Sequence, residues 1–416
     1  MKLFIIFIVL IFNQITFAKE SLTLKSADIK QLIESQNARV KGKNYQAKAM
    51  IHRQGYLKRS FLPSLKIQGA QERFSLGQNY TRTQPTYGAE LSLNLFNGLK
   101  DQLQNQVINK KKQRVDSEIK VSLYEEIIKA KEIYWTLVYL NQTFVALSEV
   151  KKINQTNLSS VERRIKSGSA TTADRFEFLM KQTEIDSNLK KVNMQKEILD
   201  KELGSILGFS NIEKIILADK FEHFEKMEDI GNHNEAQHQF LALPALLQSE
   251  ENEILARIQS RSWWPRIDAF VAFNEYNVRN GNVFGPQEGQ ETVMGLRLSM
   301  NLFDFMSGNT EASALRADAE GSRFESQYLS KLIENEAHTE ITSLNFLHQQ
   351  IHDAEENIKR SEGYLKITLA EYSRGVKNSP DVLGAIDKLF ETKNKYNEIL
   401  RDFYITRDHL KTKSEI

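Results

Sequence analysis

Hydrophobic and polar residues alternate strictly in two segments that lie far apart in the chain. Residues 90–95 read ELSLNL and residues 295–302 read GLRLSMNL, so that almost every second side chain is apolar. Such a period of two is typical of a β-strand with one apolar and one polar face. A less regular partner segment precedes each of them and begins directly after a proline, at Pro63 and Pro265. The pattern therefore predicts two β-hairpins, over residues 64–97 and 266–304.

A helical period dominates the rest of the chain. Residues 100–166 contain neither proline nor glycine, and apolar positions step by four and three in the series Ile133, Leu137, Leu140, Phe144 and Leu147. This spacing is that of a coiled-coil seam and predicts one long helix over 99–166, roughly 100 Å in length. A second long helix is expected over 305–374, and four shorter ones over 27–59, 173–207, 244–262 and 380–411.

The two halves of the chain repeat one another. Residues 88–97 and 295–304 are identical at six of ten positions and lie 207 residues apart. Two further landmarks follow in the same order, because 61–63 corresponds to 263–265 and 168–174 corresponds to 375–381. An internal repeat of this length indicates one structural unit per half. We expect the first structural repeat over 19–209, the second over 244–416, and between them a joining equatorial segment, 210–243, that packs as a belt around the helices.

The first residues have the layout of a secretory signal peptide. Lys2 is an early cation, residues 3–12 form an apolar run, and Thr16-Phe17-Ala18 ends in a small residue. This order of a charged, an apolar and a small-residue region is typical of a cleaved export signal. We therefore expect residues 1–18 to be removed.

Composition excludes several classes of function. The chain has 56 Lys and Arg residues against 54 Asp and Glu residues, and its net charge of +2 offers no basic field for nucleic acid. Because it has no cysteine, it has no disulfide, thiolate metal site or thiol nucleophile. The P-loop, nucleophile-elbow and zinc-protease motifs do not occur, so we expect no enzyme activity, no catalytic residue and no cofactor.

Histidines provide only a weak case for a metal site. His348 and His352 are four residues apart on an expected helix, with Glu355 and Glu356 nearby, and this spacing is one that zinc sites use. The ligand set is incomplete and the helix is polar, which favours solvated surface. The joining segment contains three other histidines, His223, His233 and His238. They lack ligand spacing, so no metal site is expected.

Four strands leave the architecture open. They are too few to close a membrane barrel, since the smallest such barrels use about eight. Either the strands pack on helices within one chain, or several chains share one barrel. The corresponding functions are a membrane channel subunit and a soluble periplasmic coiled-coil adaptor or scaffold protein.

The residues resemble the TolC family of outer-membrane efflux proteins. In order along the chain, the resemblance rests on Phe61-Leu62-Pro63 before the first strand, Leu95-Phe96-Asn97-Gly98 after the second, the close of the first half at residues 203–208, and the repeat. The most specific stretch is Tyr372-Ser373-Arg374-Gly375 followed by Pro380-Asp381-Val382-Leu383, which is similar to the family's Y-x-x-G-x-x-x-x-x-D-V-L turn.

The resemblance implies a mainly α fold with a transmembrane β part. In the family, three protomers each contribute four strands to one shared twelve-stranded β-barrel, and their long helices form a coiled-coil helical barrel in the periplasm. It further implies a homotrimer in the cell outer membrane, in contact with outer-membrane lipid. Such a channel-tunnel is the exit duct for efflux or type I secretion, and it opens when a periplasmic adaptor (membrane fusion protein) and an inner-membrane pump or ABC exporter engage it.

The resemblance also implies a gate at the periplasmic tip. Tyr372 matches a family tyrosine that hydrogen-bonds an aspartate on the neighbouring helix pair, and Asp174 matches that aspartate. Lys377 matches an arginine that reaches toward the same turn, and Asp381 matches the first of two aspartates that ring the pore. The turns at Gly168 and Gly375 match the end that contacts the adaptor.

The chain departs from the family pattern at several of these positions. A lysine at position 377 lacks the bidentate fork of arginine, so we expect a weaker latch. Gly384 stands where the second ring aspartate is expected, which removes one of two acidic rings. Asp174 and Asp381 also fit helix N-capping after a turn, and this role is compatible with the gate. Residues 98–99, 305–306 and 37–38 differ from the family's Gly-Gly and Asn-Pro pairs.

Overall fold

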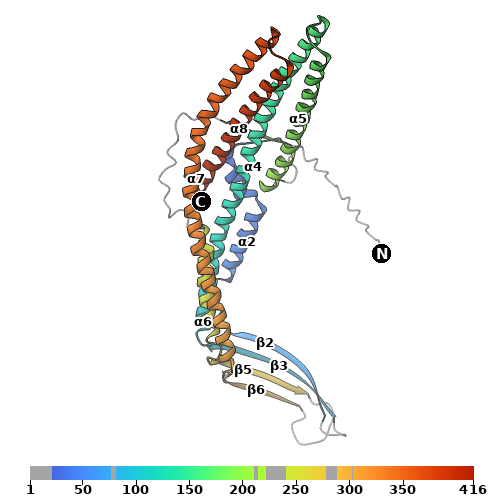
Figure 1. Cartoon of the computed structure of the whole chain (residues 1–416). Helices are drawn as coiled ribbons and strands as arrows, with labels where there is room; N and C mark the ends of the chain where they lie inside the picture. Colours follow the sequence, from blue (N-terminus) through green and yellow to red (C-terminus); the bar gives the residue numbers. More distant parts are fainter. Residues whose placement is uncertain (1–20, 76–80, 210–213, 222–239, 278–287, 302) are drawn as a thin grey trace, which may run out of the picture. The chain divides into compact units, whose positions relative to one another are not determined.

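The computed structural model describes residues 21–75, 81–209, 214–221, 240–277, 288–301 and 303–416. The expected signal peptide over 1–18 lies outside these residues, as do His223, His233 and His238. The described chain is mainly helical with few strands, which confirms the mainly α part of the predicted class (Figure 1). Within these residues, no helix combines the length and the apolar run that crossing a membrane requires.

Two compact units make up the chain, and each takes segments from both sequence repeats. The helical unit comprises Met1–Lys41, Leu123–His233 and Ala337–Ile416, and the sheet unit comprises Gly42–Ser122 and Asn234–Glu336. The two longest helices, α4 (Lys100–Lys166) and α7 (Asp304–Ser373), each contribute to both units. The boundaries of the two compact units therefore differ from the boundary between the two sequence repeats.

Long helices pack side by side in the helical unit. The C-terminal parts of α4 and α7 lie with α5 (Thr172–Ile206) and α8 (Ser379–Glu415) (Figure 1). Their shared core buries Tyr134 and Leu137 of α4 with Leu344 of α7 and Phe403 of α8. Helices of this length are stabilised mainly by packing of their apolar faces against neighbouring helices. This shared core therefore stabilises all four of them.

The chain enters the helical unit through a short parallel pair of strands. β1 (Ser21–Leu24) pairs with β4 (Lys214–Leu217), which lies in the segment that the sequence predicts to join the two halves. Tyr134, which is fully buried, donates its hydroxyl to the Leu24 carbonyl and to Asp219 Oδ2, at 3.1 and 2.9 Å. The pair is thereby attached to the middle of α4.

The predicted first helix over 27–59 is interrupted in the structure. A 3-10 turn (Ser26–Asp28) leads into α1 (Ile29–Gln36), which is followed by α2 (Ala38–Arg53) and α3 (Tyr56–Ser60). The first break is at Asn37, whose ψ of 128° is not helical and whose Oδ1 accepts from the backbone N–H groups of Arg39 and Val40. The second is at Gly55, where φ is +77°, in the left-handed region that glycine adopts without strain.

An antiparallel sheet of four strands lies in the sheet unit, together with α6 (Leu243–Gln259). Its strands are β2 (Ser64–Ser75), β3 (Thr81–Phe96), β5 (Arg266–Asn277) and β6 (Glu288–Ser299), in the order β2-β3-β5-β6. The two hairpins are therefore joined through β3 and β5, which pair from Thr86↔Tyr276 to Phe96↔Ile267 with one irregularity near Asn94.

Register places the alternating leucines of both hairpins on one face of the sheet. Leu91 pairs with Leu65 on one side and with Val271 on the other, and Val271 pairs with Met294. We call this surface the apolar face; its members are Leu65, Ile67, Tyr87, Ala89, Leu91, Leu93, Ile267, Ala269, Val271, Phe273, Met294, Leu296 and Leu298. Several of them are strongly exposed in the single chain, among them Ile67 at 80% and Leu296 at 72%.

Charged and polar side chains predominate on the opposite face. Glu90 on β3 and Arg297 on β6 form a bidentate ion pair there, with oxygen–nitrogen distances of 2.9 and 3.1 Å. Lys66, Gln68, Ser92 and Asp268 belong to the same face. We call it the polar face. The sheet thus presents two surfaces of opposite character, as the sequence period predicts.

Candidate functional site: the two helical turns

All the residues that the sequence suggests as a site lie in or beside two tight turns. Each turn joins two long antiparallel helices. The first turn joins α4 to α5 through Gly168, and the second joins α7 to α8 through Gly375. Both glycines have φ near +77°, at +76° and +79°, which side-chain-bearing residues adopt only with strain. In each turn a backbone bond of the Schellman type ends the preceding helix, from Ser169 N–H to Arg164 O in the first turn and from Val376 N–H to Glu371 O in the second.

A capping box begins the second helix of each turn. Asp174 Oδ2 accepts from the backbone N–H of Thr171 at 2.8 Å, and Thr171 Oγ1 accepts from the N–H of Asp174 at 3.3 Å. Asp381 and Asn378 make the same reciprocal pair, at 3.2 and 3.1 Å. Both aspartates therefore satisfy backbone groups at a helix start, the capping role that their sequence positions fit.

Ser379 connects the two turns. Its hydroxyl, which is fully buried, donates to Asp174 Oδ1 at 2.5 Å, and its oxygen lies 3.5 Å from the Tyr372 hydroxyl. Because the single serine proton is used for Asp174, Tyr372 is the donor in the second contact. The resemblance implies a direct bond from Tyr372 to Asp174, whereas in this structure Ser379 lies between them. Sequence reasoning did not select Ser379.

Arg164 makes the larger set of contacts between the turns, and sequence reasoning missed it as well. Its two terminal nitrogens donate to the carbonyl oxygens of Tyr372 and Ser169, at 3.1 and 3.2 Å. The guanidinium also lies over the Tyr372 ring, 4.5 Å from the centroid, in a cation–π contact. A cation in the last turn of a helix is a known partner for free carbonyls, but the last turn of α4 contains three: Arg163, Arg164 and Lys166.

Lys377 does not extend to the first turn. Its ammonium lies 3.9 Å from Asp381 Oδ1 in its own turn, and both side chains are more than one third exposed. A pair at this distance and exposure contributes little to stability. Among the cations of the two turns, Arg164 thus takes the bridging position that the resemblance implies for residue 377.

Buried apolar residues support the two turns from below. Phe178 of α5 and Val382 of α8 are fully buried in one cluster with Tyr372, and Lys181 forms an ion pair with Asp387 across α5 and α8 at 2.5 Å.

The hydrogen bond from Ser379 lowers the pKa of the Asp174 carboxyl, and the bonds from Thr171 act in the same direction. Asp174 is therefore an anion at neutral pH and is able to hold both partners.

Non-covalent contacts hold the two turns together. They combine hydrogen bonds, one cation–π contact and small apolar packing, and all of these can be broken and formed again without a covalent step. In the part of the chain that the structure describes, no group of three or more His, Asp or Glu side chains is arranged to hold a metal ion. His348 lies against the ring of Phe403, with a centroid distance of 6.3 Å.

Comparison with known proteins gives a family for the second half and a fold for nearly the whole chain. The sequence model of the outer membrane efflux protein family matches residues 237–412. None of the curated proteins compared with the chain matches it. The match supports the sequence resemblance described above for residues 237–412.

Solved structures of outer-membrane proteins have the same fold. The outer-membrane channel OprN is 10% identical, with a TM-score of 0.79 over 94% of this chain and 89% of that chain. The CmeC outer membrane channel of Campylobacter jejuni is 11% identical, with a TM-score of 0.76 over 94% and 85%. The outer membrane protein VceC of Vibrio cholerae is 12% identical, with a TM-score of 0.73 over 94% and 96%. At such identities the likeness establishes the fold.

Proposed function

We propose that this chain, which carries an outer membrane efflux protein domain of the TolC family, is one protomer of a homotrimeric channel-tunnel in the outer membrane. The trimer serves as the exit duct for efflux or type I secretion. Its sheets form the membrane part and its helices the periplasmic part. The two turns described above form the gate.

The observation that carries the proposal is the two-faced sheet. Its apolar face is strongly exposed in the single chain, and surfaces of this kind indicate contact with a membrane or another protein. A membrane barrel strand has apolar residues toward lipid and polar residues toward the lumen, and β3 and β6 have one apolar and one polar side of the kind that this requires. Three copies related by a threefold axis would supply the strands that one copy lacks.

The gate opens by separation of the two turns. In the closed state Arg164 and Ser379 hold the end of α7 and the start of α8 against the first turn. A periplasmic adaptor that binds at Gly168 and Gly375 would favour a state in which these contacts are broken. Because the sequence has no nucleotide-binding motif, the energy for transport comes from the inner-membrane pump or ABC exporter.

Mass measurement of the purified protein in detergent tests the proposal. A trimer is the expected result. A monomer that stays soluble without detergent would contradict it and would favour the periplasmic scaffold.

A substitution at residue 384 tests the pore-lining role of the second turn. We propose that three Asp381 carboxylates line the constriction, so Gly384→Asp would add a second acidic ring one helical turn away. A β-carbon at Gly384 would meet no atom within 4 Å, so the side chain can be accommodated. We expect the ratio of potassium to chloride permeability to rise roughly threefold or more, because carboxylate rings favour cations.

Reversal potentials in a salt gradient across planar bilayers provide the measurement. Gly363→Asp is the matched control, since Gly363 on α7 is equally open and gains the same charge away from the turn. An equal change in both variants would mean that the second turn does not line the constriction.

A further inference from the structure

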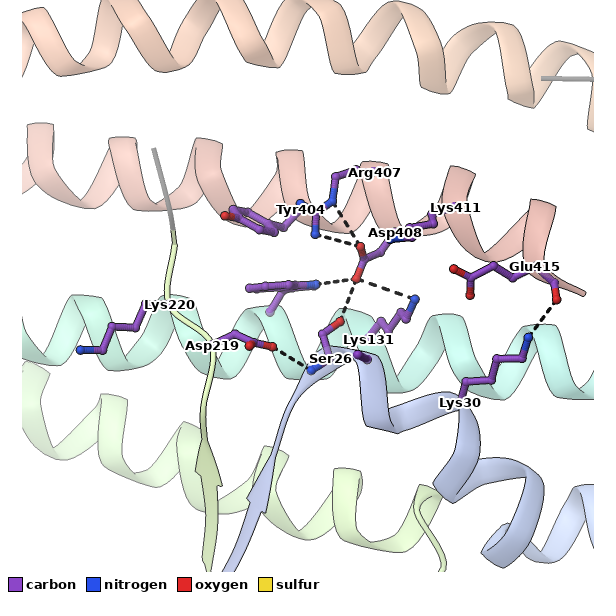
Figure 2. A pocket seen from close by; sticks show the side chains of 12 residues that line it. Ser26, Lys30, Lys131, Asp219, Lys220, Tyr404, Arg407, Asp408, Lys411 and Glu415 are labelled. Carbon is purple, nitrogen blue, oxygen red and sulfur yellow. Dashed lines mark hydrogen bonds and ion pairs between the residues drawn. The ribbon is translucent and has the colours of Figure 1, made fainter. Parts of the chain in front are cut away.

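A cavity of about 340 Å³ lies in the helical unit, apart from the two turns. Four segments that are distant in the sequence form its walls: the residues after β1, the middle of α4, the residues after β4 and the end of α8 (Figure 2). Its volume is in the range of small-molecule sites in proteins, which begins near 300 Å³. The cavity is therefore large enough for a small ligand.

Cationic side chains outnumber acidic ones around this cavity. The five cations are Lys30, Lys131, Lys220, Arg407 and Lys411, and the three acids are Asp219, Asp408 and Glu415. Two charged residues, Lys131 and Asp408, are more than nine-tenths buried. Buried charges need compensation by partners, so the partners of each group decide what the cavity can bind.

Hydrogen-bond donors already surround two of the acids. Asp408 Oδ2 accepts from Ser26 Oγ at 3.0 Å and from Trp135 Nε1 at 2.9 Å, while Oδ1 accepts from Arg407 at 3.2 Å. Figure 2 shows Ser26 and Arg407 reaching this carboxylate from two sides. Asp219 Oδ2 accepts from the backbone N–H of Ser26 and from the Tyr134 hydroxyl, at 2.8 and 2.9 Å.

Two of the lysines, Lys131 and Lys30, by contrast, donate their short hydrogen bonds to neutral groups. Lys131 donates to the neutral hydroxyl of Thr412 at 2.9 Å and lies 3.9 Å from Asp408 Oδ2, an oxygen that two other donors share. Lys30 donates to a neutral carbonyl, that of Glu415. Burial lowers the pKa of Lys131, and the attraction of Asp408 and Glu415 only partly offsets this effect. A further anion near Lys131 would relieve the cost of its burial.

We propose that this cavity binds a small organic anion through a carboxylate or phosphate group, held by the ammonium groups of Lys131 on α4 and Lys411 on α8. Charge-assisted bonds to such oxygens are stronger than neutral ones, above all in a partly desolvated site. The bound anion would join α4, α8 and the N-terminal segment. This site is independent of the channel function proposed above.

Titration calorimetry on the purified full-length protein in detergent tests the proposal. Inorganic phosphate and succinate serve as two separate probes, each at an ionic strength held constant with potassium chloride. We expect saturable binding of at least one probe, with one site per protomer, and the probe that binds identifies the group. Lys131→Met should weaken the affinity tenfold or more, and Lys411→Gln several-fold.

A matched control lies on the same helix. Lys129 is two residues away on α4, is 55% exposed and pairs with Glu202, so Lys129→Gln should leave the affinity unchanged. Lys411 is exposed, so its substitution keeps the test informative if Lys131→Met impairs folding. Absence of saturable binding by both probes would overturn the proposal, as would equal effects of Lys129→Gln and Lys411→Gln. Both outcomes concern anion binding alone, so neither would count against the proposed trimer or its conductance.

Discussion

Removal of Arg164 and Asp174 together should open the channel at rest. Arg164→Ala removes two hydrogen bonds to carbonyls and the contact with the Tyr372 ring, and Asp174→Ala removes the acceptor of the Ser379 proton. Because these groups are partly exposed, we expect each substitution to destabilise the closed state by about 1 kcal/mol. Their sum, about 2 kcal/mol per protomer, would shift the closed-to-open ratio by roughly 30-fold. The measurement is single-channel conductance and open probability in planar lipid bilayers.

Two further variants make this test specific. Arg163→Ala removes an exposed cation from the same last turn of α4 as Arg164, so it should leave the open probability unchanged. Tyr372→Phe removes only a long contact of 3.5 Å and should change the open probability only about twofold, as expected for the loss of a weak neutral bond of about 0.5 kcal/mol. If Tyr372→Phe opened the channel and Arg164→Ala did not, the direct latch implied by the resemblance would be favoured instead.

A charge on the apolar face should prevent assembly in the membrane. Leu296 lies on the apolar face of β6, three residues before the strand ends, and is 72% exposed in the single chain. Arginine on the lipid-facing side of a barrel strand costs about 2–4 kcal/mol near the bilayer centre. Three copies in one trimer multiply this cost. We therefore expect Leu296→Arg to reduce the trimer in the outer-membrane fraction tenfold or more, as measured by gel electrophoresis without heating.

Ser299→Arg is the matched control, because residue 299 lies on the same strand and on the polar face. It should assemble as the wild type does, since a lumen-facing charge stays hydrated. Normal assembly of Leu296→Arg would mean that the apolar face does not contact lipid.

Local patterns were sufficient to predict the long elements of regular structure. The sequence predicts a helix over 99–166 and a hairpin over 64–97, and the structure has α4 at Lys100–Lys166 and strands at Ser64–Ser75 and Thr81–Phe96. Absence of glycine and proline indicates the helix, strict alternation indicates the second strand of the hairpin, and both signals lie within the segments themselves. The break at Asn37 was missed because it depends on that side chain bonding to the Ile206 carbonyl, far along the chain.

The contacts of the candidate site depend on proximity that no local pattern contains. Ser379 and Asp174 are 205 residues apart, and their hydrogen bond exists only because α5 and α8 pack together. Arg164 is one of three cations at its helix end, and only the position of the second turn distinguishes it from the others. The strands β1 and β4 are four residues each and carry too little pattern to be predicted without their partner.

The central claim is that three copies of this chain form one membrane-embedded channel, and the most direct test is the mass and heat-modifiability of the purified protein in detergent. We expect a trimer that resists SDS until it is heated, with circular dichroism dominated by helix. A monomer that stays soluble when the detergent is removed would contradict the shared barrel and leave the periplasmic scaffold as the better interpretation.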